Sequence, residues 1–281
     1  MSERSMNFAG KVLDFNTPKV MGILNVTPDS FSDGNELFLD SGELSLDKAL
    51  LRAEAMSVAG AAFIDIGGES TKPGAETVSL EEEMDRVLPL VELIHKNIDV
   101  IISIDTSSPE IMLQAASAGA GLINDVRALQ RPGAIEAVSK INLPVCLMHM
   151  QGSPATMQEA PHYDNLVNEV ISFLDSRILA CTDAGINMNQ IIVDPGFGFG
   201  KTLEHNLELL GRLSEFEKLK LPLLVGLSRK AMLGLITGKS VRDRKAASIA
   251  AAVIALMKGA NIIRTHDVQD TVDAMKVYQA L

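Results

Sequence analysis

Short apolar runs rich in β-branched residues alternate with longer segments of helical periodicity along most of the chain. Such runs are typical of parallel strands that helices cover on the outside. Units of one strand and one helix, repeated eight times, close more naturally into a ring than into an open doubly wound sheet, the minor alternative. We therefore expect an α/β fold, a single (β/α)8 TIM barrel domain over residues 1–281. The predicted strands are Val20–Leu24, Ala62–Ile66, Val100–Ile104, Leu122–Asp125, Val145–Met148, Ile191–Asp194, Leu223–Val225 and Ile262–Arg264.

Residues with known positional preferences mark the ends of the predicted helices. Ser79 and Glu82 have the spacing of a capping box, in which each side chain accepts from the backbone N–H of the other residue. Ser108 followed by Pro109 predicts the start of a second helix. Glycines that end a helical run and precede a strand are expected to adopt positive φ, and these are Gly60, Gly119, Gly185 and Gly259.

The composition argues against several classes of protein. The formal net charge is −11 and no dense basic run is present, so a nucleic-acid surface is not expected. Neither Met1–Lys11 nor any later stretch has the apolar length of a signal peptide or a membrane span. Cys146 and Cys181 lie in apolar periodic segments, so neither a disulfide framework nor a metal cluster is expected. We expect a soluble cytoplasmic protein with no nucleic-acid or membrane partner.

Polar residues gather where the predicted strands end. In a (β/α)8 barrel, the carboxyl ends of the strands share one face, and the active site is built there. One such residue alone is more often a turn or a helix cap. Their recurrence after seven of the eight strands favours a functional site. The residues are Asn25, Asp105, Asn124, Asp125, His149, Asp194, Ser228, Lys230, Arg264 and His266.

Four of these side chains suit the edge of a flat, amide-like heterocycle. A carboxylate accepts two parallel N–H bonds, and amide and ammonium groups can meet carbonyl or ring nitrogen atoms. These four are Asp105, Asn124, Asp194 and Lys230.

Arg264 and His266 form a predicted anion-binding pair at the last strand. The guanidinium of Arg264 can lie over a ring face while it donates to an anion. His266 lies two residues later and points to the same side if the strand continues. Without Arg264 beside it, His266 would be as well explained by a structural role.

The glycine-rich segment Asp194–Thr202 resembles a phosphate-binding loop but departs from both known patterns. Pro195 stands where the Walker motif needs its first glycine, and the glycine spacing misses the dinucleotide fingerprint. We interpret the segment as a tight loop that lets Phe199 approach a planar ligand or join the core.

Two further segments, Thr27–Gly34 and Gly67–Gly74, follow the first two strands and lack regular periodicity. They are either lids that exclude water or ordinary surface loops. His149, His162 and His205 lack the paired spacing of a zinc-binding helix, so metal ligation by them is not expected.

Ordered motifs along essentially the whole chain resemble the dihydropteroate synthase family. So many specific blocks in one order make chance similarity negligible. The blocks are Met21–Phe31, Asp65–Thr71, Ile104–Thr106, Ile123–Asp125, Leu147–Gly152, Asp194–Lys201, Gly226–Lys230 and Arg264–Asp267.

The resemblance implies a transferase of folate biosynthesis with Mg²⁺ as its cofactor. Its members join 6-hydroxymethyl-7,8-dihydropterin diphosphate to 4-aminobenzoate and release diphosphate, and they commonly form homodimers through helices near the C-terminal end. Because no side chain is an evident covalent nucleophile, we expect an SN1-like displacement.

The same resemblance implies roles for single residues. Catalytic positions are Asp105, Lys230, Arg264 and His266. Asn25 matches a residue that helps to hold magnesium on the diphosphate, beside the anion-binding Arg264 and His266. Pterin-site positions are Asp105, Asn124, Met148, Asp194, Phe199, Gly226, Lys230 and Arg264. Positions around the 4-aminobenzoate are Phe31, Thr71, Pro73 and Ser228.

The chain departs from the family pattern at two places. Lys72 stands where many relatives carry arginine, which puts bidentate donation from that position in doubt. The segment Gly34–Ser45 is longer than in close relatives. Two rival functions stay open: a pterin-binding methyltransferase that passes a methyl group to a corrinoid protein, and a non-catalytic pterin-binding homologue.

Overall fold

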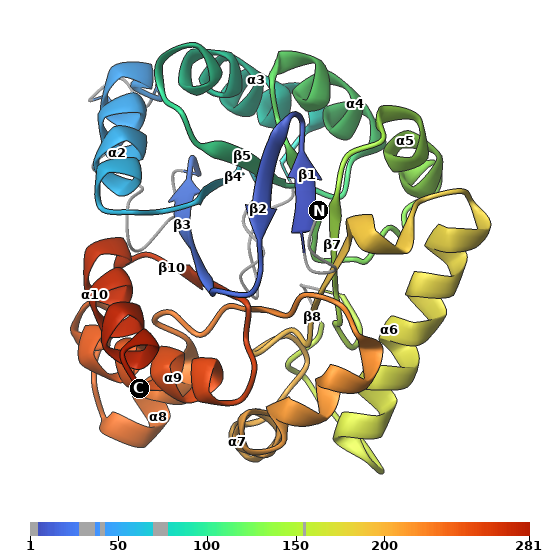
Figure 1. The fold of residues 1–281 in the computed structure, drawn as a ribbon, viewed down its shortest axis with the longest axis vertical. Helices are drawn as coiled ribbons and strands as arrows, with labels where there is room; N and C mark the ends of the chain where they lie inside the picture. Colours follow the sequence, from blue (N-terminus) through green and yellow to red (C-terminus); the bar gives the residue numbers. More distant parts are fainter. Residues whose placement is uncertain (1–4, 28–36, 40–42, 70–77, 154–155) are drawn as a thin grey trace.

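The computed structural model describes residues 5–27, 37–39, 43–69, 78–153 and 156–281. Eight parallel strands form one sheet in the order β8, β7, β6, β5, β4, β3, β10, β9. A parallel bridge between Val193 and Leu223 joins the two outer strands into a ring, which helices surround (Figure 1). The predicted (β/α)8 barrel is confirmed. The strands are β3 (Lys19–Asn25), β4 (Phe63–Gly67), β5 (Ile101–Asp105), β6 (Leu122–Asp125), β7 (Val145–Met148), β8 (Ile191–Asp194), β9 (Leu224–Val225) and β10 (Ile262–Thr265).

The outer layer consists of helices that follow the strands around the ring. Within the described residues, none of them is long and apolar enough to cross a membrane. The helices are α2 (Leu46–Val58), α3 (Leu80–Asn97), α4 (Pro109–Ala118), α5 (Ala134–Ile141), α6 (Leu166–Asp183), α7 (Leu203–Gly211), α8 (Ala231–Thr237), α9 (Lys245–Met257) and α10 (Val268–Gln279).

Most of the predicted helix boundaries are confirmed. Ser79 Oγ accepts from Glu82 N at 3.2 Å, and Glu82 Oε2 accepts from Ser79 N at 3.1 Å. Helix α4 begins at Pro109, although the Ser108 hydroxyl donates to Glu110 instead of capping the helix. Gly119 ends α4 with φ +115°, and a Cβ there would lie 2.3 Å from the His95 ring. Glycine is therefore required at this turn.

Strand residues alternate between the barrel interior and the helical layer, as the two-residue period of a strand requires. In β4, Ile64 and Ile66 pack in the cluster beneath α2 and α3. Phe63 points inward and joins the apolar cluster at the amino end of the barrel. Asp65, two residues further along, is fully buried in the interior. One short strand thus supplies the outer core, the barrel floor and a polar group above it.

An N-terminal hairpin that the sequence analysis did not predict covers the amino end of the barrel. Strands β1 (Ser5–Phe8) and β2 (Lys11–Asp14) pair antiparallel and lie across the ring in Figure 1. Phe8 is only 1% exposed and meets the Phe63 ring edge-on, with centroids 5.1 Å apart. Phe15 packs against the other side of Phe8 at 6.2 Å. The hairpin therefore completes the core at the end opposite the strands' carboxyl ends.

Phe8→Ala tests how far the barrel depends on this hairpin. Removing the buried ring should lower the free energy of unfolding by about 3–5 kcal/mol, because lost burial and a residual cavity both contribute. Val12→Ala is the matched control, since Val12 lies on the same hairpin and is 53% exposed. It should change stability by no more than about 0.5 kcal/mol. Equal denaturation midpoints for both variants would show that the hairpin adds nothing to the core.

Candidate active site at the carboxyl end of the barrel

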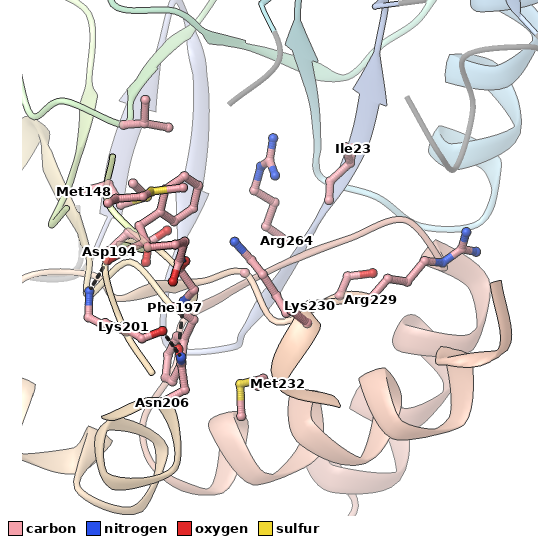
Figure 2. Close-up of a pocket in the computed structure, with 18 of the residues that line it drawn as sticks. Ile23, Met148, Asp194, Phe197, Lys201, Asn206, Arg229, Lys230, Met232 and Arg264 are labelled. Atoms are coloured by element: carbon pink, nitrogen blue, oxygen red, sulfur yellow. Dashed lines mark hydrogen bonds between the residues drawn. The ribbon is translucent and has the colours of Figure 1, made fainter. Parts of the chain in front are cut away.

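A cavity of about 550 Å³ opens at the carboxyl ends of the strands. Side chains from every part of the ring line it, and Figure 2 shows Arg264 and Lys230 reaching into it opposite Met148 and Asp194. The described residues to which the family resemblance assigned a role all belong to its lining. They are Asn25, Asp105, Asn124, Met148, Asp194, Phe199, Gly226, Ser228, Lys230, Arg264 and His266.

A carboxylate that the sequence analysis did not single out as a site residue lies beneath this lining. Asp65 Oδ2 accepts from Arg264 Nε at 2.6 Å and from Asn124 Nδ2 at 3.1 Å. Its Oδ1 accepts from Ser103 Oγ at 2.5 Å. Arg264 also donates from Nη2 to Asp105 Oδ2 at 2.9 Å. The guanidinium is therefore held between two carboxylates from neighbouring strands.

Burial controls the protonation of Asp105 and Asp194, two of the carboxyl groups that line the cavity. It raises the pKa of Asp105 to about 7, while the Arg264 guanidinium opposes the rise. It also raises the pKa of Asp194 to about 6, although Gly196 N donates to Asp194 Oδ1 at 2.7 Å. Withdrawal from water disfavours a charged carboxylate. A ligand that donates N–H groups to these oxygens would restore the charged form.

Lys230 provides a cation beside an aromatic ring. Its Nζ lies 4.1 Å from the centroid of Phe199, a cation–π arrangement that fixes the ammonium at the cavity wall. Burial lowers the pKa of Lys230 to about 8, and the Asp194 carboxylate opposes the shift. The neighbouring Arg229 points away from this group in Figure 2 and pairs with Asp267 at 2.7 Å. Both residues line the cavity, but the Arg229 guanidinium is engaged with Asp267, whereas the Lys230 amine lies over the Phe199 ring.

The predicted anion-binding pair lies at one side of the cavity, but its members differ in charge. His266 Nδ1 lies 2.9 Å from Ser228 Oγ. Burial, assisted by Arg264 and Arg229, lowers the pKa of His266 to about 3. The ring is therefore neutral at physiological pH, and Arg264 provides the positive charge of the pair. Ser228, predicted beside the 4-aminobenzoate, is engaged with this histidine.

The glycine-rich loop after β8 is closed around a buried lysine. Lys201 is 3% exposed, and its Nζ contacts Gly196 O at 2.9 Å, Phe199 O at 3.1 Å and His149 Nδ1 at 3.0 Å. Gly196 has φ +70°, and a Cβ there would lie 1.8 Å from His149 O, so only glycine fits. The lysine binds the loop's own carbonyls, which explains why this segment is not a phosphate cradle. The sequence pattern alone does not indicate this role.

Asp125, predicted among the strand-end polar residues, has a structural role. Its carboxylate accepts from Ser107 Oγ, from Arg127 N at 2.9 Å and from Leu129 N at 2.7 Å. It does not line the cavity. Arg127 in turn lies 3.6 Å from Glu69, which does line it. The turn after β6 thus braces the start of the segment that follows β4.

Several predictions concern residues outside the described part of the chain. Phe31, Thr71 and Pro73, predicted near the 4-aminobenzoate, lie there, as does Lys72. So do much of both aperiodic segments and parts of Gly34–Ser45.

Comparisons with known proteins agree in the family that they indicate. A family model described as pterin binding enzyme matches residues 21–266. The dihydropteroate synthase of Escherichia coli K12 is 54% identical over 271 residues, which cover 96% of this chain and 94% of that protein. The Yersinia pestis dihydropteroate synthase, crystallised with a sulfonamide drug, superposes with a TM-score of 0.94 at 52% identity and covers 98% of both chains. The Xanthomonas albilineans enzyme, solved with 4-aminobenzoic acid, has a TM-score of 0.91 at 45% identity and covers 99% of this chain and 97% of that one.

Lys201→Met tests the buried lysine, whose pKa burial lowers to about 7. The variant keeps the length of the side chain but leaves the acceptors on Gly196, Phe199 and His149 without their donor, which should cost about 1–3 kcal/mol of unfolding free energy. Lys140→Met is the control, because Lys140 is exposed on α5. Chemical denaturation of both variants measures the difference. A Lys201→Met protein as stable as the control would show that the loop does not need this donor.

Proposed function

The chain belongs to the dihydropteroate synthases of the pterin-binding enzyme family, and on this premise we propose that its cavity binds a pterin diphosphate and 4-aminobenzoate. The enzyme would join 6-hydroxymethyl-7,8-dihydropterin to the arylamine and release diphosphate. The observation that carries this proposal is that side chains of two kinds line one cavity. Some can accept hydrogen bonds from the edge of a heterocycle, and a cationic side chain can bind an anion. These come from strands as far apart in sequence as β5 and β10.

We propose that the pterin ring lies among Asp105, Asn124, Asp194 and Lys230. Carboxylate and amide oxygens suit the amino and ring N–H groups of the heterocycle, and the Lys230 ammonium suits its carbonyl or ring nitrogen. Met148 and Phe199 supply apolar surface, and Gly226 leaves room for the ring because it has no side chain. Arg264, fixed by its two carboxylates, would lie against the ring face.

Magnesium is proposed at the diphosphate, with Asn25 as its ligand from the protein. Asn25 lines the same cavity as Arg264 and His266. The described residues contain no cluster of three or more His, Cys, Asp or Glu side chains that could hold an ion. An amide oxygen together with substrate phosphates and waters fits Mg²⁺, which is seldom bound by protein ligands alone. The bound ion would offset the negative charge that develops on the leaving diphosphate.

The proposed reaction begins with cleavage of the C–O bond at the pterin methylene, and the bonding electrons leave with the diphosphate. Arg264 and a hydrogen bond from His266 would stabilise that anion, while ionised Asp105 and Asp194 favour the positive charge left on the pterin. The arylamine nitrogen then forms the C–N bond and loses a proton. Because none of the described lining side chains is placed as a covalent nucleophile, we infer an SN1-like displacement.

We propose that Ser228 contributes to the arylamine subsite together with Phe31, Thr71 and Pro73, which lie outside the described residues. A relative solved with 4-aminobenzoic acid shares the fold, which supports this substrate class for the present chain.

A homodimer in the cytoplasm is also proposed, by analogy with the family. Exposed apolar side chains on the C-terminal helices α8 to α10 support it. They are Leu235, Ile236, Ile254, Met257 and Val277.

A mixing assay tests the proposed function against its rivals. The synthase requires diphosphate release to depend on both pterin diphosphate and 4-aminobenzoate, in the presence of magnesium. Tight pterin binding without diphosphate release would instead indicate a binding module. Methyl transfer from a folate to a corrinoid protein would indicate the methyltransferase.

Asp105→Asn tests the electrostatic role of this carboxylate. The amide has the same shape but cannot stabilise a cationic pterin, so kcat/KM should fall by at least about 100-fold while the fold is retained. Asp175→Asn on the exposed face of α6 is the control and should keep full activity. Steady-state rates with saturating 4-aminobenzoate measure the effect. Unchanged kcat in Asp105→Asn would refute the role.

Pterin binding should depend on pH between about 5 and 9. The pKa of Asp105 is about 7 and that of Asp194 about 6, so affinity should rise as both become ionised with increasing pH. It should fall again above about 8, where Lys230 loses its proton. Binding near pH 6.5 should release protons, since ligand N–H groups favour ionised carboxylates. Calorimetry in two buffers of different ionisation enthalpy measures this release, and a buffer-independent enthalpy would contradict it.

A further inference from the structure

Asp65 is a fully buried carboxylate that does not line the cavity, yet it contacts two side chains that do. It lies in the middle of β4 and faces the barrel interior above the apolar floor that contains Phe63. Its Oδ2 receives two donors, Arg264 Nε and Asn124 Nδ2, and its Oδ1 receives the Ser103 hydroxyl. Every contact therefore uses the carboxylate as an acceptor.

This contact determines which end of the Asn124 amide faces the ligand. A primary amide has an accepting oxygen and a donating nitrogen, and either end can face the cavity unless a neighbour distinguishes them. The carboxylate oxygen that pairs with the Arg264 guanidinium is an acceptor, so Nδ2 must face Asp65 and Oδ1 must point the other way. Asn124 lines the cavity, and no other residue of the described chain donates to its Oδ1. The site therefore presents an acceptor at this position.

The same carboxylate oxygen orients Arg264. The planar guanidinium donates from Nε to Asp65 and from Nη2 to Asp105, so two carboxylates from adjacent strands fix its plane. Arg264 is separated from Asp65 by 199 positions in the sequence, and Asn124 by 59 positions. Asp65 Oδ2 thus positions both the Arg264 guanidinium and the Asn124 amide, whose oxygen is an acceptor in the cavity.

We propose that Asp65 is a positioning residue that sets the hydrogen-bond polarity of the heterocycle site. It makes the site select a ring edge that offers N–H donors and reject an edge that offers a carbonyl at the same place. This inference rests on the proposed function, because it assumes that a pterin occupies the cavity.

Asp65→Ala tests the inference with two probes, pterin and lumazine. Lumazine carries a carbonyl in place of the 2-amino group of pterin. The wild-type protein should prefer pterin by about 100-fold or more, since a site that reads a donor rejects its absence strongly. Without Asp65, the Asn124 amide can turn its nitrogen toward the lumazine carbonyl. The preference should then fall by at least about 10-fold, mainly through tighter relative binding of lumazine.

Three further variants separate polarity from charge and from folding. In Asp65→Asn, the introduced oxygen can still accept from Asn124 and Arg264 while Ser103 turns to accept from the amide nitrogen, so the preference should be retained. Ser103→Ala leaves Asp65 and both of its other partners, so it too should retain the preference. Asp65→Leu has nearly the same shape as aspartate but offers no acceptor to Asn124 or Arg264, so the preference should be lost. This variant provides the test if Asp65→Ala does not fold.

Binding measured by calorimetry without 4-aminobenzoate distinguishes the possible failures. A wild-type preference in both Asp65→Ala and Asp65→Leu would overturn the inference and leave the synthase proposal intact. If Asp65→Asn lost the preference for pterin to the same extent as Asp65→Ala, the charge of Asp65 and not its hydrogen-bond polarity would be what matters. That result would also overturn the inference. If the wild-type protein released no diphosphate but Asp65→Ala still lost the preference for pterin, the proposed function would be refuted and the role of Asp65 supported.

Discussion

Charge compensation among buried side chains holds the carboxyl end of this barrel together. Asp65, Asp105 and Asp194 are all withdrawn from water, and such carboxylates are costly unless cations and donors satisfy them. Arg264 satisfies two of them at once, and Lys230 lies near the third. The incomplete compensation leaves the pKa of Asp105 and Asp194 raised. A ligand rich in N–H groups would donate the hydrogen bonds that the carboxylates of Asp105 and Asp194 do not receive in full from the protein.

The barrel register is what allows this compensation. Asp65 pairs with Ser103 across β4 and β5, and Asp105 pairs with Asn124 across β5 and β6. Because side chains alternate with a period of two, a slip by one residue would send these polar groups into the helical layer. The apolar cluster around Phe63 opposes such a slip by holding the alternate positions at the barrel floor. Apolar packing at the amino end of the barrel therefore keeps the polar side chains at the carboxyl end in their positions.

The sequence predicted the strands and the polar residues after them, because local period and residue type carry that information. It did not predict Asp65 or Lys201 as parts of the site, since their importance lies in partners that only the folded ring brings near. Asp125 shows the converse, because a strand-end carboxylate can serve a turn as well as a ligand. The hairpin Ser5–Asp14 was missed because its short strands have little apolar pattern of their own and gain stability from the barrel end that they cover.

The position of the hairpin also offers an attachment point far from the cavity. Its turn, Ala9 and Gly10, is exposed and lies at the end of the barrel opposite the cavity. A fluorophore or surface tether attached at that turn would leave the cavity facing solution. Immobilised protein could then be screened for ligands with its entrance unobstructed.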